Sequence, residues 1–214
     1  MIFKDRQDAG KKLAQKLLAY QDEKNTLVLG LPRGGVVVAK EVAEVLHVPL
    51  DIIVTRKMGA PDNPEFAIGA VDEKGHAVFN EEALEDLGIS EEYKKEILEK
   101  EKKEAHHRLK LYRKNRPPLE LKDKIVILVD DGLATGATMR AAVYSAKAKK
   151  AKKVIVAVPV AAPSSLEKLR GESDELICLD APYFFGAVSS FYEHFDQTMD
   201  EEVTQLLKVF SPKV

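Results

Sequence analysis

The most constraining feature of the sequence is an aliphatic run that ends in two adjacent acidic residues. Residues 125–129 read Ile-Val-Ile-Leu-Val, and Asp130 and Asp131 follow directly. An unbroken aliphatic run of this length is typical of a strand buried on both faces, as in parallel sheets. A short loop then leads into a helix-compatible segment, residues 138–150. This order predicts an α/β fold with a ligand site at the carboxyl end of the strand.

The loop after the acidic pair has the chemistry of an anion site. Backbone N–H groups at a helix N-terminus suit a phosphate, and the loop's hydroxyl and small side chains add donors and space. The candidate binding residues are Ala134, Thr135, Gly136, Ala137 and Thr138. Asp130 and Asp131 would repel a phosphate but accept hydrogen bonds from neutral hydroxyls. A sugar phosphate fits both halves, and a generic strand–turn–helix with an acidic pair, as in receiver-like domains, is the alternative.

The order Asp-Asp-x-x-x-Thr-Gly-x-Thr resembles the signature of type I phosphoribosyltransferases, which bind phosphoribosyl pyrophosphate (PRPP). The resemblance spans residues 5 to about 200 and implies that Asp130 and Asp131 hold the ribose hydroxyls while the loop holds the 5′-phosphate. Ala134 stands where hypoxanthine-guanine enzymes carry Asp, so the motif is closest to the adenine type. The rest of the chain resembles an uncharacterised branch of the family with no agreed acceptor.

A second candidate phosphate loop follows the first predicted strand, residues 27–29. Gly34 and Gly35 free backbone amides at the start of a helix, residues 36–46, and Arg33 suits a bidentate grip on phosphate oxygens. The resemblance makes this the pyrophosphate loop, in which a cis peptide bond on either side of Pro32 is expected. An ordinary strand-to-helix turn is the alternative.

Basic residues follow the second predicted strand, residues 49–55. The resemblance assigns Arg56 and Lys57 to the leaving pyrophosphate, although a surface basic pair is the alternative. The breaker-rich segment after them, residues 58–66, suits a lid that excludes water. It contains Glu65, which the resemblance to adenine-type lids makes a candidate catalytic base.

Strands at 154–158 and 175–179 complete a predicted five-stranded, mainly parallel sheet with helices on both faces. We expect one phosphoribosyltransferase-like domain over residues 1–214. Three features extend it: a β-hairpin (68–71 and 76–79), a charged helical insert (81–117) and a C-terminal hood (181–214). Residues 181–196 of the hood hold six of the chain's fourteen aromatic residues. These rings either stack on an acceptor base or cover the edge of the sheet.

Composition narrows the class of protein. Lys plus Arg number 33 against 35 Asp plus Glu in 214 residues, which argues against a general nucleic-acid binder. We expect the lysines between 147 and 153 to form a solvated helix end. The single cysteine, Cys178, excludes internal disulfides and favours a reducing compartment. Without an apolar signal core or a membrane-length apolar run, the sequence predicts a cytoplasmic protein with no membrane partner.

Together these features predict a pentosyl-transferring enzyme of nucleotide metabolism. It would transfer 5-phosphoribosyl from PRPP to a nitrogenous base and release pyrophosphate. The resemblance implies Mg²⁺, held largely by substrate and water, with Asp130 or Asp131 as its protein ligand. The predicted catalytic residues are Asp130, Asp131, Arg33, Lys57 and Glu65. A non-catalytic PRPP- or nucleotide-binding regulator is the competing function, and family habit suggests a homodimer.

Overall fold

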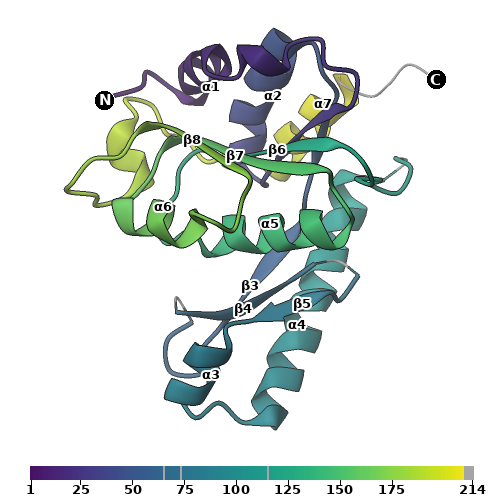
Figure 1. Ribbon diagram of the computed structural model, residues 1–214, viewed down its shortest axis with the longest axis vertical. Coiled ribbons are helices and arrows are strands. Elements are labelled where there is room, and N and C mark those ends of the chain that lie inside the picture. The colour runs from purple at the N-terminus through teal and green to yellow at the C-terminus, as the bar shows by residue number, and fades with distance from the viewer. Residues whose placement is uncertain (65, 73, 115, 210–214) are drawn as a thin grey trace.

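The fold is built around strand β6 (Ile125–Val129), at the centre of a parallel sheet (Figure 1). The computed structural model describes residues 1–64, 66–72, 74–114 and 116–209. Within these residues the large sheet has five strands in the order β2-β1-β6-β7-β8. The other strands are β1 (Thr26–Gly30), β2 (Leu50–Ile52), β7 (Lys153–Val160) and β8 (Glu175–Asp180). All adjacent pairs are parallel, so the predicted sheet is confirmed.

Helices cover both faces of this sheet, as predicted. One face carries α1 (Arg6–Gln15), α2 (Gly34–Leu46) and α7 (Asp200–Val209), and the other carries α5 (Ala137–Ala148) and α6 (Pro163–Leu169) (Figure 1). Alternate residues of β6 divide between the two resulting cores. Ile127 and Val129 pack with α1, α2 and α7, whereas Val126 and Leu128 pack with α5. This division explains the unbroken aliphatic run, because both faces of the strand are buried.

Local capping explains where several helices begin and end. Asp5 accepts a hydrogen bond from the Asp8 N–H at 2.8 Å and so caps the start of α1. Gly136 has a left-handed φ of 73° directly before α5, and His47 ends α2 with a φ of 55°. None of the helices in the described segments is long and apolar enough to cross a membrane.

A second, smaller sheet contradicts one prediction. Strands β3 (Thr55–Gly59), β4 (Ala67–Asp72) and β5 (Ala77–Phe79) form an antiparallel sheet that confirms the predicted hairpin and adds a strand to it. The strand predicted over 49–55 is present as β2, but its predicted end is wrong, because β2 ends at Ile52 and a new strand begins at Thr55. Arg56 and Lys57 therefore lie inside β3 rather than after a strand of the large sheet. Two consecutive basic side chains do not match the composition of a typical strand, so the sequence does not predict β3. The strand forms here because it pairs with β4.

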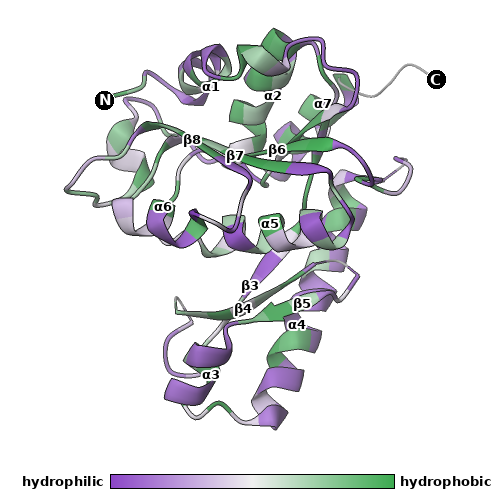
Figure 2. Cartoon of the chain, in the orientation of Figure 1, coloured by the Kyte–Doolittle hydropathy of each residue, from purple (hydrophilic) through white to green (hydrophobic). Residues whose placement is uncertain are grey.

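The predicted helical insert consists of two helices. Helix α3 (Glu81–Asp86) is separated from α4 (Glu91–Tyr112) by a turn in which Gly88 has a φ of 58°. Ser90 caps α4 by accepting a hydrogen bond from the Tyr93 N–H. Ile97 of α4 packs with Met58 of the small sheet, so insert and small sheet share one core. The two form a lobe beyond α5, and α3 is drawn mainly in hydrophilic colours (Figures 1 and 2).

A buried ionic cluster fastens this lobe to the large sheet. Asp72, whose side chain is fully buried, lies at the end of β4 and accepts hydrogen bonds from Lys149 at 2.7 Å and Ser145 at 3.1 Å. Nδ1 of His76 lies 3.0 Å from the same carboxylate. Lys149 is itself 7% exposed. The prediction of a solvated lysine-rich helix end is therefore wrong for this residue.

Replacing Lys149 with methionine should strongly destabilise the fold. The change leaves the buried carboxylate of Asp72 without its cation, which typically costs about 3–5 kcal/mol. Urea unfolding measures the loss. Lys147→Met, at an exposed position near the end of α5, is the matched control and should change the free energy of unfolding by less than about 0.5 kcal/mol. Similar values for the two variants would contradict the role of the cluster.

The same cluster predicts a pH dependence of stability. Burial by itself would raise the pKa of Asp72, but hydrogen bonds from Lys149 and His76 outweigh it and lower the pKa from 3.8 to about 2. A carboxyl group with a lowered folded-state pKa stabilises the fold above its unfolded pKa, and this contribution disappears as pH falls through the folded value. The stability difference between wild type and Lys149→Met should therefore shrink between about pH 4 and pH 2, as urea titrations at several pH values would measure.

Candidate functional site

The two predicted phosphate loops meet at the carboxyl edge of the large sheet. Strands β1 and β6 pair in register, with Gly30 opposite Val129, and the Leu31 N–H continues the ladder by donating to the Val129 carbonyl at 2.9 Å. The loop after β1 therefore lies beside the loop after β6. Helices α2 and α5 begin directly after these loops, and the peptide bond between Pro32 and Arg33 is cis.

Gly34 and Gly35 bring the first loop into contact with the acidic pair. A Cβ atom on Gly34 would overlap Oδ2 of Asp131. A Cβ atom on Gly35 would lie 2.7 Å from Oδ1 and 2.8 Å from Cα of Asp130. Neither glycine has a positive φ, so glycine is needed here for space rather than for backbone conformation. The structure thus brings four of the predicted site residues into direct contact.

Each carboxylate of the pair uses one oxygen within the protein. Oδ1 of Asp130 accepts a hydrogen bond from the Asp131 N–H at 2.9 Å, and Oδ2 of Asp131 accepts one from Nε of Arg6 at 2.7 Å. Among the hydrogen bonds of the described residues, Oδ2 of Asp130 and Oδ1 of Asp131 have no partner. The site therefore offers two acceptor oxygens, one from each residue, to a ligand.

The acidic pair has perturbed ionisation. Burial raises the pKa of Asp130, and the negative charge of Asp131 raises it further. Burial also raises the pKa of Asp131, although the Arg6 guanidinium acts in the opposite direction. Two neighbouring carboxyl groups of this kind favour cations and hydroxyl donors as ligands and disfavour anions.

The second loop is anchored at two points. Ser165 on α6 donates to the Ala134 carbonyl at 2.6 Å, and Thr55 of β3 donates to the Thr138 carbonyl at 3.3 Å. Between these anchors Gly136 turns the chain into α5. The loop is thus held by the small sheet as well as by a helix that packs on the large sheet, and its amides at the start of α5 are oriented without a ligand.

The predicted basic residues differ in their surroundings. Arg33 is partly exposed, with Nη1 3.9 Å from a carboxylate oxygen of Asp200. Arg56 donates to Glu101 on α4 at 2.8 Å. Because side chains alternate along a strand, Lys57 lies on the opposite face of β3 from Arg56. The predicted base Glu65 lies outside the described residues.

The N-terminal segment of the chain packs against the hood. Phe3 pairs with residues 191 and 193 through hydrogen bonds of 2.8 Å, and its ring packs on Tyr192. The Tyr192 hydroxyl donates to the Asp131 carbonyl at 2.6 Å. Phe185, Phe191 and Phe195 join this cluster, whereas Tyr183 and Phe184 are 88% and 87% exposed. Most of the hood aromatics therefore cover the edge of the sheet.

Arg6 is the site residue that the sequence analysis missed. It is the first residue of α1, and it reaches across the hood to Asp131. The sequence indicates a helix start at this point, but helical periodicity does not tell which distant carboxylate the side chain meets.

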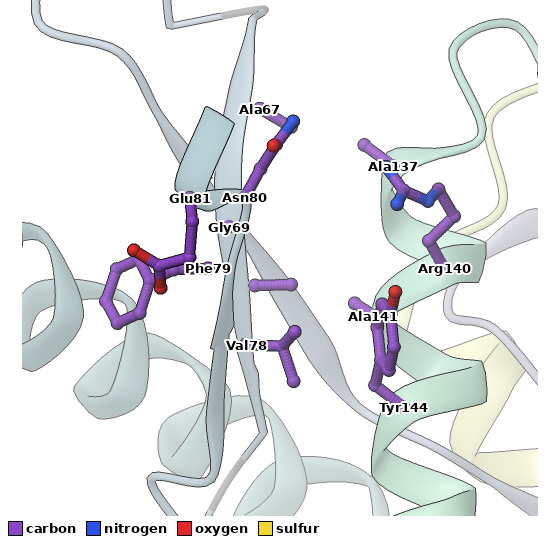
Figure 3. Close-up of a pocket in the computed structure, with 11 residues that line it drawn as sticks. Ala67, Gly69, Val78, Phe79, Asn80, Glu81, Ala137, Arg140, Ala141 and Tyr144 are labelled. Carbon is purple, nitrogen blue, oxygen red and sulfur yellow. The ribbon is translucent and has the colours of Figure 1, made fainter. Parts of the chain in front are cut away.

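A cavity of about 210 Å³ lies beside the second loop, between the small sheet and α5 (Figure 3). Its walls include Ala70 and Val78 on one side and Ala141 and Tyr144 on the other. The side chains of Phe79 and Glu81 point away from α5. Of the predicted site residues that the structure describes, only Ala137 lines this cavity.

Parallel strands, two helix N-termini and an acidic pair thus meet at one edge of the large sheet. The chain belongs to the phosphoribosyl transferase domain family, whose model matches residues 2–194. The five parallel strands with flanking helices form the fold of the type I enzymes, as the motif predicted.

Two curated relatives support this family assignment. The chain is 42% identical over 206 residues to proteins from two strains of Mycobacterium tuberculosis, each named "Putative phosphoribosyl transferase". The match covers 96% of this chain and 46% of those proteins, so the chain spans about half the length of these curated relatives.

Among solved structures, TT1426 from Thermus thermophilus is 41% identical, with a TM-score of 0.88 over 99% of this chain and 100% of that one. The AQ2163 protein from Aquifex aeolicus is 16% identical, with a TM-score of 0.51 over 82% of this chain and 74% of that one, and shows the fold alone.

Replacing Gly35 with alanine should destabilise the protein. The added methyl group meets the backbone of β6 and its carboxyl end, and overpacking of this kind typically costs about 1–3 kcal/mol. Thermal unfolding measures the effect. Gly186→Ala is the matched control, because no heavy atom lies within 4 Å of the position that its methyl group would take, and its φ is not positive. Equal melting temperatures for the two variants would contradict the close contact.

Proposed function

We propose that this protein is a cytoplasmic phosphoribosyltransferase that transfers 5-phosphoribosyl from PRPP to a nitrogenous base and releases pyrophosphate. The observation that carries the proposal is the pair of acceptor oxygens, Oδ2 of Asp130 and Oδ1 of Asp131, between two loops that each open into a helix N-terminus. Two hydroxyls between two phosphate groups is the pattern that PRPP presents. Family membership supports the reaction class.

Asp130 and Asp131 would orient the ribose by accepting hydrogen bonds from its 2′- and 3′-hydroxyls. The amides at the start of α5, with the hydroxyls of Thr135 and Thr138, would hold the 5′-phosphate at the other side of the sugar. Gripping the sugar at both sides fixes C1′ relative to the first loop and the incoming base. Positioning of this kind lowers the entropic part of the barrier.

The first loop would bind the pyrophosphate that leaves. The amides of Gly34 and Gly35 lie at the start of α2, and Arg33 adds a guanidinium that suits phosphate oxygens. As the bond to C1′ breaks, negative charge grows on the pyrophosphate, and these donors stabilise it more in the transition state than in the ground state. Lys57 is a further candidate for this role. Arg56 contributes less, because Glu101 already binds it.

Magnesium fits the site as a substrate-bound ion. The described residues contain no group of three or more histidine, cysteine or acidic side chains that could form a metal cage. The two carboxylate oxygens of the acidic pair are hard donors of the kind that Mg²⁺ prefers, and one or two such ligands suffice when phosphates supply the others. When bound, Mg²⁺ would supply positive charge next to the leaving pyrophosphate.

PRPP with Mg²⁺ should raise the melting temperature of the protein. A ligand at about a hundred times its dissociation constant stabilises the native state by about 2.7 kcal/mol, or several degrees for a chain of this size. Differential scanning fluorimetry with PRPP, ribose 5-phosphate and pyrophosphate checks this. Asp130→Asn should reduce the shift caused by PRPP, and no shift in the wild-type protein would contradict the proposed site.

Replacing Arg33 with alanine should lower PRPP-dependent pyrophosphate release by about a hundredfold, the loss typical of one transition-state donor. The assay screens purine, pyrimidine and pyridine bases as acceptors. Arg170→Ala, at a 73% exposed arginine, is the control and should keep wild-type activity. PRPP binding without turnover on any base would favour the regulatory function instead.

A further inference from the structure

The N-terminal segment places a largely covered guanidinium in the proposed sugar site. Arg6 begins α1, 125 residues before Asp131 in the sequence, and its Nε donates to Oδ2 of Asp131 at 2.7 Å. The side chains of Arg6 and Asp131 are 11% and 15% exposed. A charge-assisted hydrogen bond with this little exposure to water is stronger than a surface ion pair.

Further contacts fix the orientation of the Arg6 guanidinium. Nη1 donates to the Asp196 carbonyl at 2.7 Å, and the guanidinium carbon lies 3.8 Å from the centre of the Phe195 ring. A Cβ atom on Gly34 would lie 2.7 Å from Nε and 3.0 Å from Nη2, so the group also packs on the first loop. Arg6 therefore touches both walls of the proposed site and the hood that covers it.

These contacts determine how Asp131 presents its carboxylate. Arg6 takes Oδ2, and the Tyr192 hydroxyl holds the backbone carbonyl of the same residue at 2.6 Å. Rotation of the carboxylate would break the bond to Arg6, so Oδ1 keeps its direction. The guanidinium also offsets the repulsion between two adjacent buried carboxylates.

We propose that Arg6 is a positioning residue of the phosphoribosyl site, which holds Asp131 so that its second carboxylate oxygen accepts a ribose hydroxyl. This inference rests on the proposed function. Arg6 acts through Asp131 and stays in place when the sugar binds, since its bond to Asp196 and its contact with Phe195 do not involve the ligand. The opposite arrangement, in which Arg6 occupies the place of the sugar and must leave, makes the opposite prediction for affinity.

The test compares Arg6→Gln, Arg6→Lys, Asp131→Asn and the double variant Arg6→Gln/Asp131→Asn. PRPP dissociation constants come from calorimetry, and KM for PRPP, KM for the base and kcat come from pyrophosphate release. Arg170→Gln, at an exposed arginine, is the matched control. Melting temperatures show whether each variant is folded.

We expect Arg6→Gln to weaken PRPP binding and raise its KM by about ten- to a hundredfold, with a smaller change in kcat and in KM for the base. Arg6→Lys should recover part of this loss, because it keeps the charge but not the planar geometry. In the Asp131→Asn background, Arg6→Gln should raise the PRPP dissociation constant by less than about threefold, because the two residues act as one unit. If Arg6→Gln does not fold, Arg6→Lys alone carries the test.

Three results would overturn the inference. These are unchanged PRPP binding in folded Arg6→Gln, tighter PRPP binding in that variant, and the same loss with and without Asp131. Tighter binding would mean that Arg6 competes with the sugar. If the wild-type protein does not bind PRPP at all, the proposed function fails and this inference fails with it. If the wild-type protein binds PRPP and folded Arg6→Gln binds it equally well, only the inference about Arg6 is overturned.

Discussion

The site depends on the parallel pairing of β1 with β6. Because these strands end in register, the loops that follow them are forced into contact, and only glycine leaves room for the acidic pair between them. Without Gly34 and Gly35 the loops would separate, and without the aliphatic faces of β6 the pairing would not be buried. The strand whose alternating side chains build the two cores thus also places the acidic pair beside the loop that follows β1.

The parts of the fold that depend on consecutive residues could be predicted from the sequence. Local sequence patterns predict the strand at 125–129, the acidic pair at its end and the glycine-containing loop after it. The structure has a strand and a helix start at these positions. The large sheet follows because buried parallel strands are aliphatic throughout. The hairpin 68–71 and 76–79 could also be predicted, since two mainly apolar segments flank a polar turn that contains glycine.

Three features could not be predicted from the sequence, because contacts between distant residues determine them. Strand β3 carries Arg56 and Lys57, which read as a loop until β4 pairs with them. Lys149 reads as a solvated residue at a helix end, yet it is buried against Asp72 from another sheet. Arg6 reads as an ordinary residue in the first turn of a helix, because its meaning depends on the fold bringing residues 6, 131 and 196 together. No spacing rule encodes such a meeting.

The small sheet is more than an attached lobe, because one cross-strand pair joins it to the start of α5, where the second loop ends. Thr55 and Asp72 face each other in the β3–β4 ladder. Thr55 bonds to Thr138 at the start of α5, while Asp72 bonds to Ser145 and Lys149 further along the chain. The cavity between the small sheet and α5 lies beside this pair and includes Ala67, Gly69 and Ala70 of β4 in its lining. The lobe is therefore held to α5 through this pair, and a change in its position would act first on the loop that begins the helix.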